Sequence, residues 1–306
     1  MPSAGSFTAA DVPDQSGRCI IVTGANTGIG FEAAKALAAR GARVLLACRS
    51  KDKAEAAKAR IRQAAPEADV AFLPLDQADL ASVRRAAEQA AEEPRIDVLV
   101  NNAGVMFPPL TRTAQGFELQ FGVNHLGTFA LAALLLPKLA ETPGSRVVVT
   151  SSLAHQRGDL QWDDLNAEKG YNRTQRYSDS KLANILHFAE LDRRLRAAGS
   201  PVTAIGCHPG VAATELLRHS GVFRFAAPAV GLFLNSAAMG AWPALQAATD
   251  PQAEPGGYYG PQGMGEMKGR SGKAKRTAQA QDPELARRLW DVSVEMTGID
   301  PGLAAA

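Results

Sequence analysis

The chain has 306 residues, of which 46% are hydrophobic and 21% are charged, a composition typical of a soluble globular enzyme. Its formal net charge of +2 argues against a nucleic-acid partner or an anionic membrane surface. The three cysteines, Cys19, Cys48 and Cys207, lie far apart without a CxxC spacing. They predict neither a disulfide framework nor a metal site, and they favour a reducing, cytoplasmic compartment.

The distribution of apolar and polar segments predicts one domain. Residues 1–15 lack a basic start and an apolar run, so we expect a flexible tail without a signal peptide. Residues 16–306 show no repeat and no linker, which indicates a single catalytic domain. The uncharged stretch 225–249 approaches the length of a membrane helix, but its prolines and polar residues argue against a span. We expect a helical substrate lid over about 214–248, with core packing or a subunit contact as the alternative.

Short apolar runs alternate with helix-patterned segments along the chain. Strands are expected at 18–22, 42–48, 70–76, 96–104, 146–152 and 202–210. Helices are expected at 29–40, 51–64, 80–92, 126–139, 177–197 and 283–297. This alternation predicts an α/β fold with a doubly wound parallel sheet. Right-handed crossovers then bring the carboxyl ends of the strands to one edge of the sheet.

A glycine-rich turn, VTGANTGIG, follows the first strand and opens the first helix. Residues without a Cβ let the backbone approach a pyrophosphate, and the helix N-terminus offers unpaired N–H groups. The turn therefore predicts a dinucleotide site, and a tight turn without a ligand is the alternative. The residues assigned to this site are Gly24, Asn26, Thr27, Gly28, Ile29 and Gly30.

Arg49 ends the second strand, where an NAD-binding protein usually has an acidic residue for the ribose. An arginine suits a 2′-phosphate instead, through charge-assisted hydrogen bonds of about 1.5–3 kcal/mol each. Lys53 adds positive charge nearby. The sequence therefore predicts NADP(H) as cofactor, unless Arg49 is simply a solvated residue after a strand.

The fourth strand runs into the loop NNAG, residues 101–104. Ala103 and Gly104 leave room for a flat ring or a ribose, and Asn102 can satisfy backbone groups. The tetrapeptide alone could be an ordinary loop. Its predicted place at the same sheet edge as the glycine turn makes it a candidate cofactor contact.

Tyr177 and Lys181, in YSDSKLANIL, stand four residues apart on a predicted helix. At this spacing both side chains lie on one helix face. A nearby ammonium lowers the pKa of a phenol and makes it a usable acid–base group. A chance pair is the alternative for these two residues alone. The fifth strand ends in Ser151 and Ser152, where a hydroxyl can donate to a carbonyl oxygen.

Together, TGANTGIG, NNAG, TSS, YSDSK and HPG resemble the short-chain dehydrogenase/reductase family, over about residues 17–214. LACR, SSLAH and YSDSKLANIL resemble its retinol-dehydrogenase-like branch. The resemblance implies a Rossmann-type sheet and the following site. Tyr177 would be the proton donor or acceptor, Lys181 would bind the ribose and tune the tyrosine, Ser152 would orient the substrate oxygen, and Asn124 would hold a water. Asp76 would contact the adenine, and Pro209, Gly210, Val211 and Thr214 would contact the nicotinamide.

The resemblance implies an NADPH-dependent oxidoreductase that transfers a hydride between the nicotinamide and a carbonyl or alcohol. The apolar stretch after residue 214 favours an apolar small-molecule substrate. Two alternatives are a protochlorophyllide-reductase-like enzyme and a regulator that binds NADPH without turnover. The helices at 126–139 and 177–197 could form the face of a homodimer or homotetramer. The basic run 268–276 lacks the residues of a phosphate loop, so we expect it to be a solvated loop.

Overall fold

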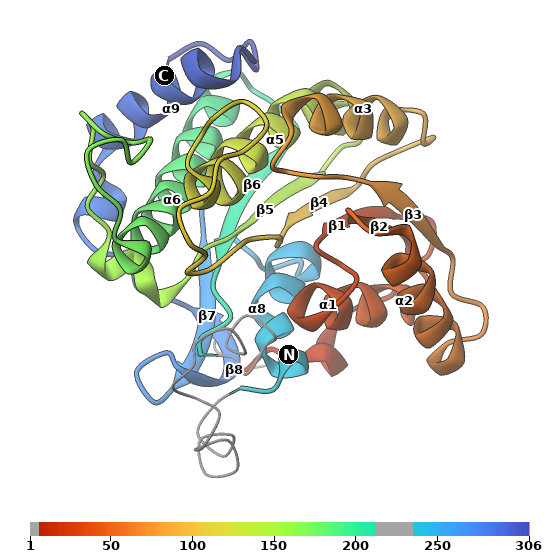
Figure 1. Ribbon diagram of the computed structural model, residues 1–306. Coiled ribbons are helices and arrows are strands. Elements are labelled where there is room, and N and C mark those ends of the chain that lie inside the picture. Colours follow the sequence, from red (N-terminus) through yellow and green to blue (C-terminus); the bar gives the residue numbers. More distant parts are fainter. Residues whose placement is uncertain (1–5, 212–234, 306) are drawn as a thin grey trace.

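The structure, a computed structural model, describes residues 6–211 and 235–305. One eight-stranded sheet has the order β3-β2-β1-β4-β5-β6-β7-β8 (Figure 1). Strands β1 to β7 pair in parallel, and β8 is antiparallel to β7 at one edge. The expected doubly wound α/β fold is confirmed. The strands are β1 (Cys19–Thr23), β2 (Arg43–Cys48), β3 (Val70–Pro74), β4 (Val98–Asn101), β5 (Arg146–Thr150), β6 (Thr203–Cys207), β7 (Tyr258–Gly263) and β8 (Lys268–Lys273).

Helices cover both faces of this sheet (Figure 1). One layer contains α3 (Leu80–Ala91), α5 (Gly127–Ala140), α6 (Arg173–Ala197) and α9 (Pro283–Thr297), and the other contains α1 (Gly28–Ala38), α2 (Lys51–Ala64) and α8 (Ala237–Thr249). In β1, Cys19 and Ile21 pack into the first layer and Ile20 and Val22 into the second. Successive strand residues point to opposite faces, which explains why a strand covered on both sides is a continuous apolar run.

The helix that carries Tyr177 is longer than expected, because α6 begins at Arg173. The Asn172 side chain caps it by accepting hydrogen bonds from the N–H groups of Thr174 and Gln175. Helix α9 packs along α6, and its Trp290 contacts Phe129 of α5 with ring centroids 5.2 Å apart. The C-terminal helix therefore occupies part of the α6 surface considered for a dimer contact, and the oligomeric state stays a prediction.

One helical stretch in the described part of the chain, Leu119–Ala140, is long and apolar enough to cross a membrane by composition alone. However, 89% of its apolar window is buried inside the protein, which is the pattern of a core helix. Helix α8, at the end of the expected lid, agrees with the alternative of core packing. Nine of its thirteen residues are buried, and it packs against the sheet beside α1. The expected lid residues 214–234 lie outside the described residues.

Two further segments that differ from the sequence analysis, the basic run and the N-terminal tail, lie side by side at the sheet edge. The basic run 268–276 is not a solvated loop, because Lys268–Lys273 forms β8. The expected flexible tail is ordered from Ser6 onward: Phe7 is buried and exchanges two backbone hydrogen bonds with Ser271, at 3.0 and 2.9 Å. Each segment supplies backbone partners to the other, and this pairing over more than 260 residues has no local sequence signal.

Candidate active site

A cavity of about 380 Å³ lies along the carboxyl ends of the parallel strands, where open α/β sheets bind their ligands. We call it the edge cavity. Its lining contains most of the predicted site residues, namely Gly24, Asn26, Thr27, Gly28, Ile29, Gly30, Arg49, Asp76, Asn102, Ala103, Gly104, Tyr177, Lys181 and Pro209. It also contains residues that the sequence analysis did not assign, among them Gln77, Val105, Leu119, Val123 and Thr150.

The glycine turn packs so closely against the fourth strand that side chains are excluded. Gly24 has a positive φ of 67°, which glycine adopts readily. A Cβ on Gly30 would lie 2.5 Å from both the Gly24 carbonyl oxygen and the Asn102 Nδ2. Thr27, the N-cap of α1, makes no side-chain cap hydrogen bond. The first N–H groups of α1 are thus left for a ligand, and the turn fits the pyrophosphate of a dinucleotide.

Thr23 joins the glycine turn to the NNAG loop. Its Oγ1 accepts hydrogen bonds from the N–H groups of Asn102 and Ala103, at 3.0 and 2.9 Å, and its carbonyl accepts one from Asn102 Nδ2 at 2.9 Å. Asn102 therefore stabilises its own loop and joins the carboxyl ends of β1 and β4. Ala103 and Gly104 line the edge cavity beside it.

The corner of the edge cavity at the end of β2 is electropositive. Arg49 and Lys53 are exposed and line it, and the N-terminus of α2, capped by Ser50, adds a partial positive charge. Asp76 is the one acidic residue of the described lining. One of its carboxylate oxygens accepts a hydrogen bond from the Ala78 N–H at 2.9 Å, which fixes the side chain.

Tyr177 and Lys181 lie on one face of α6 at the far end of the same cavity. The Lys181 Nζ is 5.7 Å from the centroid of the Tyr177 ring and donates to the Thr150 carbonyl at 3.3 Å. Tyr177 is 8% exposed, but it still lines the cavity. The sequence analysis is right that these two residues share a helix face, and the fold brings that face to the glycine turn.

Burial controls the proton affinities of this pair. Burial raises the pKa of Tyr177 to about 12, and a hydrogen bond with the Ser152 side chain offsets part of the shift. Burial also lowers the pKa of Lys181 to about 8. The sequence analysis expected the ammonium to lower the pKa of the phenol. In the structure burial dominates the pKa of Tyr177, the offset comes from Ser152, and Lys181 is not among the causes of the shift.

Three comparisons agree with this geometry. The family model described as short chain dehydrogenase matches residues 18–222. The chain belongs to the short chain dehydrogenase family. Human retinol dehydrogenase 11 is 44% identical over 286 residues, which cover 92% of this chain and 86% of that protein. The match supports the retinol-dehydrogenase-like branch, so this chain is an oxidoreductase of a family that uses a nicotinamide cofactor.

Solved structures support the same assignment. A crystal structure of an uncharacterized protein from Mycobacterium Paratuberculosis is 39% identical, with a TM-score of 0.82, and covers 97% of this chain and 100% of that one. A short chain dehydrogenase from Burkholderia cenocepacia J2315, solved in complex with NADP, is 26% identical with a TM-score of 0.62. That alignment covers 78% of this chain and 93% of the Burkholderia chain.

Asn124, which is expected to hold a water, is fully buried and is not among the described lining residues of the edge cavity. It lies in a π-helical turn, η2 (Gly122–Leu126), a feature that is frequent at functional sites. Its Oδ1 accepts from the Val105 N–H at 2.7 Å, and its Nδ2 donates to the Val105 carbonyl and to Ser180 Oγ. The side chain is fully buried and joins the loop after NNAG to α6. These bonds position the start of the Tyr177 helix relative to the NNAG loop, and the role of Asn124 in holding a water stays a prediction.

Of the predicted serine and the predicted nicotinamide contacts, only Pro209 is among the described residues that line the cavity. Ser152 caps the 3-10 helix η3 (Leu153–Arg157) by accepting from the Ala154 N–H, and its side chain is near enough to Tyr177 to offset part of the rise in the phenol's pKa. Pro209 lines the cavity, whereas Gly210 and Val211 lie behind it. Thr214 lies outside the described residues.

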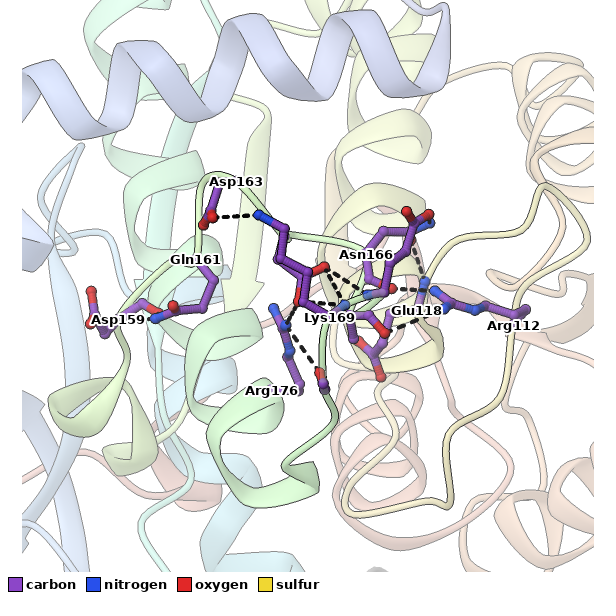
Figure 2. A network of polar contacts seen from close by, with 12 residues as sticks. Arg112, Glu118, Asp159, Gln161, Asp163, Asn166, Lys169 and Arg176 are labelled. Atoms are coloured by element: carbon purple, nitrogen blue, oxygen red, sulfur yellow. Dashed lines mark hydrogen bonds and ion pairs between the residues drawn. The ribbon is translucent and has the colours of Figure 1, made fainter.

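A polar network fixes the segment that leads into α6 (Figure 2). Arg176 is paired with Asp164 at 2.8 Å, and both side chains are at most 10% exposed. Asn166 accepts a hydrogen bond from the N–H of Glu118, the N-cap of the short helix α4 (Leu119–Phe121), and Arg112 donates to the Asn166 carbonyl. The start of the Tyr177 helix is therefore tied to the wall of the edge cavity. No sequence motif signals this network.

Proposed function

We propose that this protein is an NADPH-dependent oxidoreductase that interconverts a carbonyl and an alcohol on an apolar small molecule. The observation that carries the proposal is that Tyr177 and Lys181 line the same cavity as the glycine turn. A proton donor and a dinucleotide cradle in one cavity are the two parts that carbonyl reduction requires.

The cofactor would lie along the sheet edge. Its pyrophosphate would be held at the N-terminus of α1, and the 2′-phosphate of NADPH would meet Arg49 and Lys53 in the electropositive corner. The nicotinamide end would then lie beside Pro209 and Lys181. When bound, the cofactor supplies the hydride, and the protein supplies the proton and the orientation of both reactants.

Tyr177 would donate the proton to the substrate oxygen. With a pKa of about 12, the phenol carries its proton at neutral pH and can act as an acid. Ser152, whose side chain lies near the phenol, would orient the same oxygen. Lys181 remains largely protonated at pH 7, because even its lowered pKa is about 8. Its charge would stabilise the phenolate that is left after the transfer.

The substrate side of the cavity favours an apolar molecule. Val105 follows the NNAG loop and lines the cavity, and Phe107 packs on the Tyr177 ring. Such a lining gives little compensation for the buried polar groups of a sugar or an acid. The names of the retinol dehydrogenases among the relatives point to apolar alcohols for those proteins, and the same substrate class is proposed for this chain.

The test is an NADPH- and NADH-consumption screen of the purified protein over ketones, aldehydes, retinoids and steroids. Arg49→Ala should raise the KM for NADPH about 10- to 150-fold and leave NADH turnover unchanged, because it loses the bonds to the 2′-phosphate. Arg287→Ala, on the surface of α9 and paired only with acidic neighbours, is the matched control. Equal or better use of NADH by the wild type refutes the phosphate role. NADPH binding with no turnover of any carbonyl would favour a regulatory protein.

A further inference from the structure

The end of β6 and the β7–β8 hairpin, residues 258–273, form a second layer behind the edge cavity. The strand β6 continues into His208, Pro209, Gly210 and Val211, and only Pro209 of these reaches the cavity. The hairpin lies outside residues 18–222, the part matched by the family model. The family motifs therefore assign no role to the hairpin or to its contacts with residues 208–211.

His208 is a fully buried side chain with a partner on each ring nitrogen. The Gly210 N–H donates to its Nδ1 at 3.2 Å, and its Nε2 lies 3.2 Å from Glu266 Oε2. A backbone N–H can only donate, so Nδ1 has no proton. The geometry therefore assigns the tautomer in which Nε2–H donates to the Glu266 carboxylate.

Glu266 has a backbone conformation that is unusual for its residue type. Its φ is +67°, and Met264 before it has a φ of +51°. Non-glycine residues in this left-handed region are uncommon, and their backbone is strained. The Glu266 side chain is held at both oxygens, since Oε1 accepts from the Lys275 N–H at 2.9 Å and Oε2 accepts from His208. The strained turn thus aims this carboxylate at His208.

Two glycines show how closely the hairpin fits around this unit. A Cβ on Gly260 of β7 would lie 2.0 Å from His208 Nε2, so the imidazole fills the space that the glycine leaves. A Cβ on Gly210 would lie 2.4 Å from the Met267 carbonyl oxygen. Neither neighbour has room to shift, because one contact is to a fully buried ring and the other is to backbone.

Asn235 holds the same segment from a third direction. Its side-chain Nδ2 donates to the Pro209 carbonyl at 3.0 Å, and its backbone N–H donates to the Val211 carbonyl at 2.9 Å. The Val211 N–H in turn donates to the Met267 carbonyl at 2.9 Å. Every one of these bonds fixes the backbone behind Pro209, and none of them enters the edge cavity.

We propose that Glu266 is a positioning residue that acts through His208 to hold the backbone of Pro209–Val211 at the nicotinamide end of the cavity. The inference rests on the proposed function for the identity of the ligand. Without the carboxylate, the imidazole loses its acceptor in a buried site, and the Gly210 N–H loses a fixed partner. A shift of about 1 Å in this backbone would displace the reacting ring and lower the rate about 10- to 100-fold.

The test compares Glu266→Ala with Glu266→Gln and with Glu254→Ala. Glu254 pairs with Lys273 of the same hairpin through exposed side chains and serves as the control. We expect Glu266→Ala to lower kcat about 10-fold or more and to raise the Kd for NADPH several-fold. Glu266→Gln should fall between the wild type and the Ala variant, because its one carbonyl oxygen can still accept from Nε2–H while its NH2 group no longer accepts from the Lys275 N–H. Glu254→Ala should match the wild type in both measurements.

The cofactor Kd, measured by fluorescence without substrate, separates this inference from the proposed function. If the wild type binds NADPH but reduces no carbonyl, the proposed chemistry fails, and the order of the Kd values still decides the role of Glu266. Where Glu266→Ala does not fold, His208→Asn replaces it, because an asparagine Oδ1 keeps an acceptor for Gly210 and loses the link to Glu266. Wild-type kcat and Kd in the folded Ala variant, or a Gln variant as impaired as Ala, would overturn the proposal.

Discussion

The rings of Phe107 and Tyr177 are 5.2 Å apart and meet edge to face at 73°. Phe107 reaches this position with a φ of +58°, a conformation that is costly for a bulky residue. Its N–H donates to Oε1 of Gln120, which is fully buried and held on its other side by Tyr171 and the Arg173 carbonyl. The hydrogen bonds of Gln120 therefore stabilise the strained backbone of Phe107. This conformation places an aromatic ring against the predicted catalytic phenol.

Phe107→Ala should lower kcat/KM for compact apolar carbonyls by about 10- to 100-fold, the equivalent of one lost aromatic contact in a buried pocket. It should also reduce the discrimination against bulkier substrates, because the space beside Tyr177 opens. Leu110→Ala is the control, since Leu110 follows in the same loop but is 47% exposed. Steady-state kinetics over a series of ketones of increasing size checks both effects. An unchanged preference for size in Phe107→Ala would contradict the role of the ring.

Tyr177→Phe should abolish carbonyl reduction and leave the Kd for NADPH within about 3-fold of the wild type. The substitution removes the proton donor but keeps the ring and its contact with Phe107, so the packing is preserved. Single-turnover measurements with saturating NADPH separate the chemical step from binding. Tyr259→Phe is the control, because its hydroxyl accepts from the Glu254 N–H away from the cavity. A near-normal rate in Tyr177→Phe would require another acid.

The sequence predicts the strands of the sheet interior and the part of the site that depends on backbone conformation, the glycine turn. β1, β2, β4, β5 and β6 are apolar runs because both faces of each strand are covered, and the glycine turn is visible because only glycine tolerates its close approach. β7 and β8, by contrast, contain four glycines, a proline and two lysines. Their stability comes from pairing with β6 and with Phe7, which no local pattern records.

The parts of the site that the sequence does not predict depend on long-range packing. The pKa values of Tyr177 and Lys181 follow from how completely the fold excludes water, which the spacing of four residues does not encode. Asn235 and Glu266 meet the end of β6 from 26 to 58 residues away. These contacts join a loop, a buried imidazole and a hairpin, so they have no fixed spacing that a motif could describe.

Lys181→Met should abolish turnover and, at the same time, stabilise the protein at pH 7. The folded-state pKa of Lys181 falls from 10.5 to about 8 because of burial, so keeping this ammonium charged costs on the order of 3 kcal/mol. A methionine of similar length removes that cost. The Thr150 carbonyl keeps a hydrogen bond from Asn184 at 3.0 Å, so no buried acceptor is left unpaired. Thermal unfolding of both proteins measures the difference.

The pH dependence of this stabilisation has a definite sign. Between about pH 8 and pH 10.5 the unfolded chain binds the Lys181 proton and the folded chain does not. The wild type therefore gains stability from this residue as the pH rises through that window, and the cost is fully present below it. The advantage of Lys181→Met should be greatest at pH 7 and should disappear near pH 10.5. A constant difference across this range would show that the pKa of Lys181 does not change on folding, so that burial imposes no cost on its charge.

Gly30→Ala tests the close packing of the glycine turn, because two physical effects predict opposite changes in stability. Helix propensity alone would make an alanine in α1 more stable than glycine by about 1 kcal/mol. The structure predicts the reverse, since the added Cβ would lie 2.5 Å from the Gly24 carbonyl oxygen and the turn would have to open. We expect a lower melting temperature and a Kd for NADPH raised at least 10-fold, measured by calorimetry. Gly170→Ala, with nothing within 4 Å of its added Cβ, should change neither quantity. A stabilised Gly30→Ala variant with normal affinity would mean that the turn has room for a side chain and does not hold the pyrophosphate closely.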